Sequence, residues 1–186
     1  MQTKRIILAI SGASGIQYSL DVAQGLANAG IEIHLILSTA ARTVMQHEDI
    51  NPESLLSLAH TDHDPNNIAA PPASGSWQHD GMIVCPCSMA SLAAIANGLG
   101  TNLMHRAADT CLKEGRRLII VPRETPLNAI HMENMLKANR AGATILPACP
   151  GFYHQPSTIP DLTRHLAGKI LDQLEIPHTL YKRWGE

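Results

Sequence analysis

Alternation between two kinds of segment is the feature that most constrains the fold of this chain. Residues 5–10 form an apolar, β-rich run, and the turn SGASG separates them from a segment whose apolar residues recur at helical spacing from Ile16 to Ala27. A strand that is apolar on both faces, followed by an amphipathic helix, is the repeating unit of a covered parallel sheet. The pattern therefore predicts an α/β fold.

The same alternation continues to the end of the chain. Periodicity predicts further strands at 31–37, 82–84, 118–121 and 143–146, and helices at 40–47, 51–58, from 88 onward, and at 103–114, 127–141 and 159–174. Residues 60–80 are rich in proline and polar residues and predict a long loop, in which we interpret HTDHD as solvated rather than metal-binding. We expect one domain, residues 1–186, built as a single doubly wound parallel sheet of Rossmann or flavodoxin type in three αβα layers.

Composition narrows the classes of partner. The net charge is -2 and no run of Lys and Arg occurs, so we expect neither nucleic acid nor a membrane surface as a partner. The first fifteen residues resemble a first strand more than a signal peptide or a spanning helix, which favours a cytoplasmic location. The four cysteines are spaced unlike a structural zinc site or a disulfide framework, and we expect reduced, mostly buried thiols.

Polar side chains follow the predicted strands. Arg123 and Glu124 come one proline after the apolar run 118–121, at the strand ends where open parallel sheets bind ligands. Backbone N–H groups of SGASG could hold a phosphate, or the glycines could serve only a tight turn. Ser38, Ser88 and Ser91 would line the same edge, although Ser88 is equally explained as a helix cap. Because Ser38 stands where a ribose-binding acid would be, a nicotinamide cofactor is disfavoured.

Several cations are candidates for binding a phosphate. Arg106 and Lys113 lie seven residues apart on one predicted helix and share a face, and Lys169 lies beside the apolar stripe of the last helix. A solvated face explains most pairs such as Arg106 and Lys113, and snorkelling is the simple explanation for Lys169. If they converge with Arg123 and the hydroxyl of Tyr153, they would form a phosphate or diphosphate site.

Seven motifs, in order across nearly the whole chain, give a stronger indication. They are SGASG, PPASGS, CPCSMASL, NLMHRAAD, LKEGRRL, PRETPLNAIHMENML and GATILPACPGFYHQP. Together they resemble the UbiX-type flavin prenyltransferases, which are related to the peptidyl-cysteine decarboxylases. PRETP combined with PGFYHQP is far more specific than the glycine turn.

The resemblance implies a metal-independent enzyme that joins a dimethylallyl group from dimethylallyl phosphate to N5 and C6 of reduced FMN. The product, prenylated FMN, would serve a UbiD-type decarboxylase, and the enzyme would form a homododecamer with flavin sites between subunits. The residues corresponding to FMN-binding positions are Gly12, Ala13, Ser14, Ser38, Ser88, Met89, Ala90, Ser91 and Arg123. The prenyl-phosphate pocket corresponds to Ser74, Arg106, Lys113, Arg123, Glu124, Tyr153 and Lys169, with Glu124, Glu48 and Ser14 as the catalytic set.

Two aromatic residues complete these expectations. Trp77, beside the PPASGS loop, would wall the prenyl pocket. Aromatic residues make up only 3% of the chain, so Trp184 or another tail residue of a neighbouring subunit would help to enclose the flavin.

Two positions depart from the family pattern. Lys169 stands where many relatives have arginine, which replaces a bidentate fork with a point charge, and Ala90 stands where many have lysine. Neither change removes a reacting group, so we expect activity to be retained. The alternatives are a flavin-dependent decarboxylase of peptidyl or pantothenoyl cysteine, and a flavin-binding subunit without catalytic activity.

Overall fold

The computed structural model describes residues 3–183 and residue 185. These residues form a six-stranded sheet in which every pair of neighbouring strands is parallel. In the spatial order β3-β2-β1-β4-β5-β6, its strands are β1 (Arg5–Ile10), β2 (Glu32–Leu37), β3 (Thr61–His63), β4 (Gly81–Cys87), β5 (Leu118–Pro122) and β6 (Thr144–Ile145). The strand order reverses between β1 and β4, which is the point where ligands bind in open α/β sheets. The predicted doubly wound parallel sheet is confirmed.

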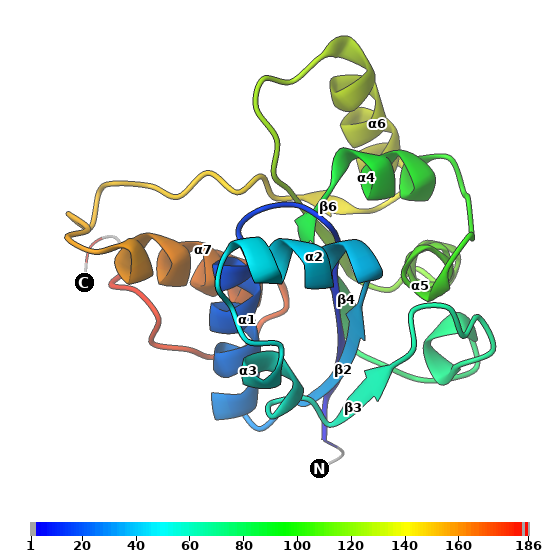
Figure 1. Cartoon of the computed structure of the whole chain (residues 1–186), viewed down its shortest axis with the longest axis horizontal. Helices are drawn as coiled ribbons and strands as arrows, with labels where there is room; N and C mark the ends of the chain where they lie inside the picture. The colour runs from blue at the N-terminus through cyan, green and yellow to red at the C-terminus, as the bar shows by residue number, and fades with distance from the viewer. Residues whose placement is uncertain (1–2, 184, 186) are drawn as a thin grey trace.

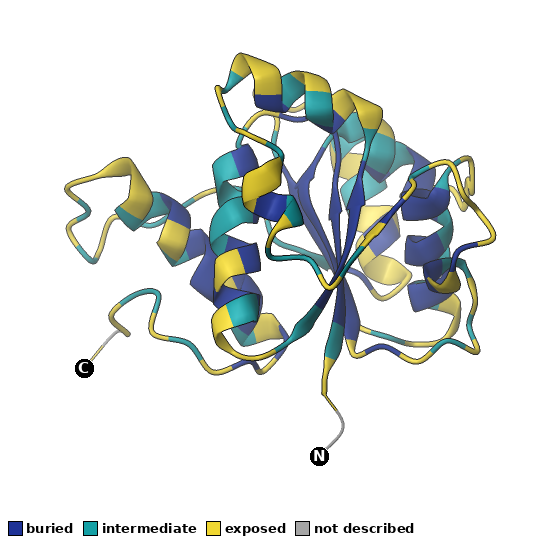
Figure 2. Cartoon of the chain, turned by 60° about the horizontal axis from the view of Figure 1, so that its bottom comes forward, coloured by how far each residue is buried: buried dark blue, intermediate teal, exposed yellow. Residues whose placement is uncertain are grey.

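Helices cover both faces of this sheet (Figure 1). In chain order they are α1 (Ile16–Asn28), α2 (Thr39–His47), α3 (Glu53–Leu56), the short 3-10 helix η1 (Pro71–Ala73), α4 (Met89–Ala96), α5 (Leu103–Lys113), α6 (Ala129–Arg140) and α7 (Ile159–Gln173). Figure 2 shows the strands as a buried layer between two layers of helices with exposed outer faces. No helix in the described part of the chain is both long enough and apolar enough to cross a membrane.

The two faces of the sheet carry separate hydrophobic cores. One core packs alternate strand residues against α1, α2, α3 and α7, and the other packs the intervening residues against α4, α5 and α6. Leu8 aligns with Leu35 on β2 and with Ile83 on β4, so this row of side chains crosses the centre of the first core. Each fully buried Leu or Ile side chain contributes about 1.5–3 kcal/mol, which explains why continuous apolar strands predict this sheet.

Residues 60–80 contain more regular structure than the sequence predicts. β3 pairs with β2 through Thr61 opposite His34 and His63 opposite Ile36, and η1 follows it. The strand has the sequence TDH, so no apolar pattern reveals it, and only its pairing with β2 defines it. His63 is buried, so the interpretation of HTDHD as a solvated loop is wrong for this residue.

Side-chain caps fix where the helices start. Asn128 accepts a hydrogen bond from the N–H of His131, and α6 therefore starts at Ala129, two residues later than predicted. Ser38 and Ser88 cap α2 and α4 in the same way. The chain between β5 and α6, which contains Glu124, is thus an exposed loop rather than part of a helix.

The thiols agree with the sequence prediction. Cys85, Cys87 and Cys111 are free and buried, whereas Cys149 is free and exposed. Burial raises the pKa of Cys85 and of Cys111 to about 12, so these two thiols are protonated at neutral pH.

Candidate active site

Ser11 joins the turn after β1 to the end of β4. Its hydroxyl donates to the carbonyl oxygen of Pro86 (2.9 Å) and accepts a hydrogen bond from the N–H of Ser88 (2.7 Å). Ser11 is almost completely buried, so both bonds are shielded from water. The two loops at the reversal point of the strand order are therefore held together as one unit.

Gly12 brings this turn against the start of α2. A Cβ atom at Gly12 would lie 2.5 Å from the Cβ of Ala40, a distance that atoms in contact do not reach. A glycine is required here because the backbone approaches α2 so closely. Ser38, which caps α2, is thereby placed at the same edge of the sheet as Ala13 and Ser14.

The serines at this edge differ in where their hydroxyl protons point: that of Ser88 goes to Ser91, whereas that of Ser38 can point to a ligand. Ser88 Oγ accepts from the N–H of Ser91 (3.3 Å) and donates to Ser91 Oγ (3.3 Å), whereas Ser38 Oγ accepts from the N–H of Ala41 (3.1 Å). A hydroxyl that accepts a backbone hydrogen bond still has its own proton to donate. Met89 and Ala90 form the first turn of α4 beside Ser88, half-buried and exposed respectively.

Arg123 connects the end of β5 to the turn after β1. Its Nε donates a hydrogen bond to the carbonyl oxygen of Ser14 (3.0 Å). The next residue, Glu124, is exposed, and its Oε1 accepts a hydrogen bond from the N–H of Thr125 (3.0 Å). The sheet edge therefore presents a guanidinium and a carboxylate next to each other.

Glu48 occupies the start of α1. Its two carboxylate oxygens accept hydrogen bonds from the N–H groups of Gly15 (2.6 Å) and Ile16 (2.9 Å). These are the N–H groups at which a helix N-terminus attracts an anion. For these two amides the anion is the protein's own carboxylate, so of the N–H groups of SGASG that of Gly15 is already bound by Glu48.

A cavity of about 1080 Å³ lies beside β6. It is lined by residues of the segment after β6, of α7 and of the C-terminal tail, among them Tyr153 and Lys169. Ala148, next to the lining residue Cys149, donates a backbone hydrogen bond to Pro122, the residue before Arg123. The cavity therefore approaches, at Cys149, the strand end that carries Arg123 and Glu124, and two of the predicted prenyl-phosphate residues line it.

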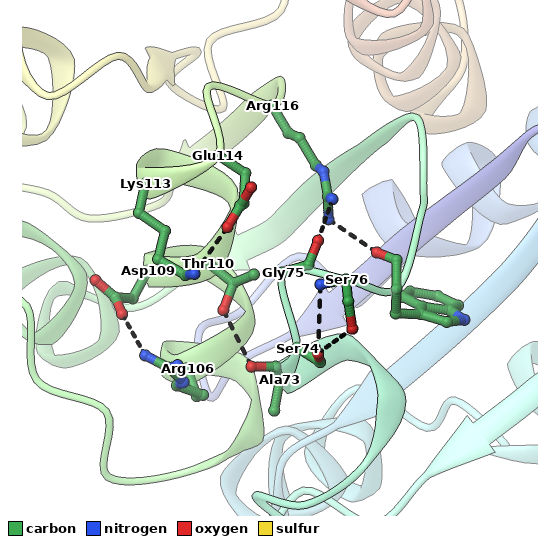
Figure 3. A network of polar contacts seen from close by, with 11 residues as sticks. Ala73, Ser74, Gly75, Ser76, Arg106, Asp109, Thr110, Lys113, Glu114 and Arg116 are labelled. Carbon is green, nitrogen blue, oxygen red and sulfur yellow. Dashed lines mark hydrogen bonds and ion pairs between the residues drawn. The ribbon is translucent and has the colours of Figure 1, made fainter.

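Three other residues that were predicted to bind the prenyl phosphate form a separate group at η1 and α5 (Figure 3). They are Ser74, Arg106 and Lys113. Arg106 pairs with Asp109 (2.7 Å) and Lys113 pairs with Glu114 (2.7 Å). Ser74 follows η1, and Thr110 Oγ1 holds that segment by donating to the carbonyl oxygen of Ala73 (3.2 Å). Exposed ion pairs of this kind contribute little to stability, which leaves both cations available to a ligand.

The structure does not bring these two groups together within one chain. α5 packs on one face of the sheet and α7 on the other (Figure 1). The conditional expectation that Arg106 and Lys113 converge with Arg123 and Lys169 therefore fails inside a single chain. Helix periodicity shows that two residues share a helix face, but it does not say which face of the sheet that helix covers.

Trp77 lies at the opposite edge of the sheet from Arg123. Its ring contacts His34 edge-on at 4.7 Å, and the guanidinium of Arg5, the first residue of β1, lies 6.0 Å from its centroid. The sequence suggested that Trp77 walls the prenyl pocket. In its own chain Trp77 does not, because that pocket would lie at the carboxyl edge of the sheet. Trp184, the other aromatic residue of that expectation, lies outside the described residues.

Sequence reasoning missed three residues beside the cavity. Asp172 on α7 binds Tyr181 and Arg183 of the C-terminal tail, and both tail residues line the cavity. The only available signal was the run of polar and aromatic residues after α7, which has no periodicity that predicts contact with the helix.

The sequence as a whole matches proteins of known family. A family model described as Flavoprotein matches residues 1–172. The flavin prenyltransferase UbiX of Alkalihalophilus pseudofirmus is 47% identical, with 98% of this chain and 97% of the relative covered. UbiX of Methanothermobacter thermautotrophicus is 46% identical, with 97% and 95% covered.

The chain belongs to the UbiX family of flavin prenyltransferases.

Solved structures agree with this family assignment. AnUbiX (PadA1), crystallised with FMN and dimethylallyl pyrophosphate, matches with a TM-score of 0.97 at 42% identity, covering 100% of this chain and 99% of that one. A dodecameric FMN-dependent UbiX-like decarboxylase from Escherichia coli matches with a TM-score of 0.94 at 40% identity, covering 98% and 100%. The peptidyl-cysteine decarboxylase EpiD, at 16% identity and a TM-score of 0.67, shares the fold alone.

Proposed function

We propose that this flavin prenyltransferase transfers a dimethylallyl group from dimethylallyl phosphate to N5 and C6 of reduced FMN. The product is prenylated FMN, and its recipient is a UbiD-type decarboxylase. The observation that carries the proposal is the Arg123–Glu124 pair, which the bond to Ser14 fixes at the reversal point of the sheet. A relative with 42% identity that binds both FMN and dimethylallyl pyrophosphate supports it.

FMN fits the carboxyl edge of the sheet. Gly12 packs the turn closely against α2, and hydroxyl groups and a guanidinium are donors that suit a phosphate. The amides of Gly15 and Ile16 are taken by Glu48, so these side-chain donors hold the FMN phosphate. The proposed FMN-binding residues are Gly12, Ala13, Ser14, Ser38, Ser88, Met89, Ala90, Ser91 and Arg123.

The donor phosphate requires a second copy of the chain. Tyr153 and Lys169 line the cavity on the α7 side of the sheet, whereas Ser74, Arg106 and Lys113 lie on the opposite face, so we assign these three to the site of a neighbouring subunit. Large apolar side chains that are exposed in the single chain, including Ile130 (66%) and Phe152 (69%), fit burial between subunits. The dodecameric relative supports a homododecamer.

The cations stabilise the departing phosphate, and Glu124 transfers a proton. Breaking the allylic C–O bond of the donor leaves negative charge on the departing phosphate, and preorganised cations stabilise that charge. Reduced FMN supplies the nucleophilic nitrogen and carbon and a π face that stabilises positive charge on the prenyl fragment. Closing the new ring at C6 releases a proton, which Glu124 accepts and can pass to the phosphate.

Two further residues support this centre. Ser14 is exposed at the turn and its carbonyl oxygen binds Arg123, so we place its hydroxyl beside the reacting groups. Glu48 fixes the turn that carries Ser14 through Gly15 and Ile16, and we assign it a positioning part in catalysis. We further propose that the chain works as one cytoplasmic domain and needs no metal.

An anaerobic assay tests the function. The purified protein is incubated with reduced FMN and either dimethylallyl monophosphate or dimethylallyl diphosphate, and the flavin is analysed by mass spectrometry. We expect a flavin heavier by one C5 unit with at least one donor. An unchanged flavin mass with both donors would exclude the transferase function, and flavin binding without turnover would favour a non-catalytic subunit.

A further inference from the structure

Three residues of the C-terminal tail bind one carboxylate on α7. Asp172 Oδ1 accepts hydrogen bonds from His178 Nε2 (3.1 Å) and Arg183 NH2 (2.8 Å), and Oδ2 accepts from the hydroxyl of Tyr181 (2.5 Å). The Asp172 side chain is only 18% exposed, so these bonds are shielded from solvent. The carboxylate thus folds residues 178–183 back along the helix.

Gly168, one turn before Asp172, allows the tail to lie flat on α7. A Cβ atom at Gly168 would come within 2.4 Å of the Tyr181 ring and 2.8 Å of His178. The ring also meets His165 of α7 in a T-shaped contact at 5.0 Å. The tail position therefore depends on two independent features of the helix, a carboxylate and a missing side chain.

The folded tail forms one wall of the cavity that contains Tyr153 and Lys169. Three cations line this cavity, Lys169, Lys182 and Arg183, and its described lining residues include no Asp or Glu. Lys169 Nζ also lies 3.8 Å from Asp172 Oδ2, so the carboxylate lies between two of the cations. The three lining cations outnumber this one carboxylate, which suits the cavity to an anion.

The charges that hold the tail persist at neutral pH. Burial acts to raise the pKa of Asp172, but hydrogen bonds from Tyr181, Arg183 and His178 outweigh it and hold the pKa at about 2. Burial and the bond to Asp172 raise the pKa of Tyr181 to about 12. Asp172 is therefore ionised and Tyr181 protonated at neutral pH.

We propose that Arg183 is a further residue that binds the donor phosphate, and that Asp172 is the residue that positions it. The inference rests on the proposed function and adds a cation from the tail to that site. Arg183 lines the cavity together with Lys169, and its guanidinium is a planar fork of N–H donors. The Cζ atom of Arg183 lies 5.7 Å from the centroid of the Tyr181 ring, and this cation–π contact further orients the guanidinium. Lys169 supplies a point charge, and Arg183 supplies the bidentate geometry that a phosphate favours.

Kinetics and binding of four variants test this proposal. For Arg183→Met and Asp172→Asn we expect the KM for dimethylallyl phosphate to rise about 10- to 100-fold, as for a lost hydrogen bond to a charged group. The Kd for FMN should stay within about twofold, because the FMN site rests on other residues. Arg183→Lys should recover part of the KM, and Gly168→Ala should reproduce the Asp172→Asn effect by displacing Tyr181.

Glu175→Gln is the matched control. Arg117 binds Glu175 and the carbonyl oxygen of Gln173, so this pair anchors the same turn without lining the cavity. The control should leave the KM for the donor unchanged. An equal fall in FMN affinity and donor affinity, or an unchanged donor KM in Arg183→Met, would overturn the proposal.

Calorimetry separates this inference from the proposed function. Dimethylallyl monophosphate is titrated into the complex with oxidised FMN, so binding is measured without turnover. Weaker donor binding in Arg183→Met than in the wild type supports the inference, and equal binding contradicts it. If the wild-type protein makes no prenylated flavin in the mass assay, the function fails whatever the titration shows.

Discussion

Arg123 Nε donates a 3.0 Å hydrogen bond to the backbone carbonyl oxygen of Ser14, although 109 residues separate the two in the sequence. The bond links the end of β5 to the turn after β1, across the intervening strand β4. It fixes the guanidinium over the edge where we place FMN, and it leaves the neighbouring Glu124 exposed. We therefore propose different parts for these two adjacent residues, Arg123 in binding and Glu124 in proton transfer.

Arg123→Met should weaken FMN binding. Losing a charged donor to a phosphate typically lowers affinity about 10- to 100-fold. The FMN affinity of Arg123→Lys should lie between those of the wild type and Arg123→Met, because a lysine keeps the charge but cannot make the bidentate contact. Quenching of flavin fluorescence measures the Kd. Arg140→Met, at the exposed end of α6, serves as the control and should bind like the wild type. Wild-type affinity in Arg123→Met would remove Arg123 from the FMN site.

Glu124→Gln should keep FMN binding and slow turnover. A general acid or base contributes about 10²- to 10⁴-fold to a rate, and the amide keeps the size of the side chain but cannot accept the proton. Single-turnover prenylation followed by mass spectrometry measures the change. Glu133→Gln, an exposed acid on α6, provides the matched control. Near-normal turnover would reduce Glu124 to a partner of the Thr125 amide.

Glu48→Gln should destabilise the protein more than it slows the reaction. The variant loses the charge that binds the amides of Gly15 and Ile16 at the start of α1, and we expect the free energy of unfolding to fall by about 1–2 kcal/mol. Urea denaturation at one fixed protein concentration checks this value. Turnover at saturating FMN should fall less than about tenfold, because the remaining oxygen still accepts one amide. A loss as large as that of Glu124→Gln would place Glu48 in the chemistry itself.

The His34 and His63 pair should make the protein less stable in mild acid. Burial, with His63 and His60 nearby, lowers the pKa of His34 from 6.5 to about 4. The unfolded chain protonates His34 more readily than the folded protein does. The stabilisation that neutral His34 contributes to the folded state is therefore complete above pH 6.5 and is lost as the pH falls towards 4. It amounts to at most about 3 kcal/mol.

Urea denaturation between pH 4 and pH 8 measures this dependence. Compared with the wild type, His34→Gln should show a shallower fall of unfolding free energy below pH 6.5, since its amide does not titrate. His47→Gln, at an exposed position on α2, should keep the wild-type slope. Parallel curves for His34→Gln and the wild type would show that another group causes the loss.

Local sequence determines the sheet and the edge of the site. Runs such as RIILAI and LIIVP are apolar on both faces, so the strands form wherever helices can cover them, and Ser38 and Ser88 mark helix starts because their hydroxyls satisfy amides within the next turn. The position of Arg123 and Glu124 after a strand was predictable for the same reason. The reaction and the roles of the individual residues were predicted from the family motifs.

Contacts between distant segments are decided only in the tertiary structure. β3 forms because β2 offers an unpaired edge. Glu48 binds the amide of Gly15 because α2 packs beside α1. Asp172 binds Arg183 because the chain reverses direction after α7. None of these leaves a periodic pattern, since hydrophobic periodicity records which face of an element is buried and not which polar group it meets. The separation of Lys113 from Lys169 onto opposite faces has the same origin, because the helices lie on opposite sides of one continuous sheet.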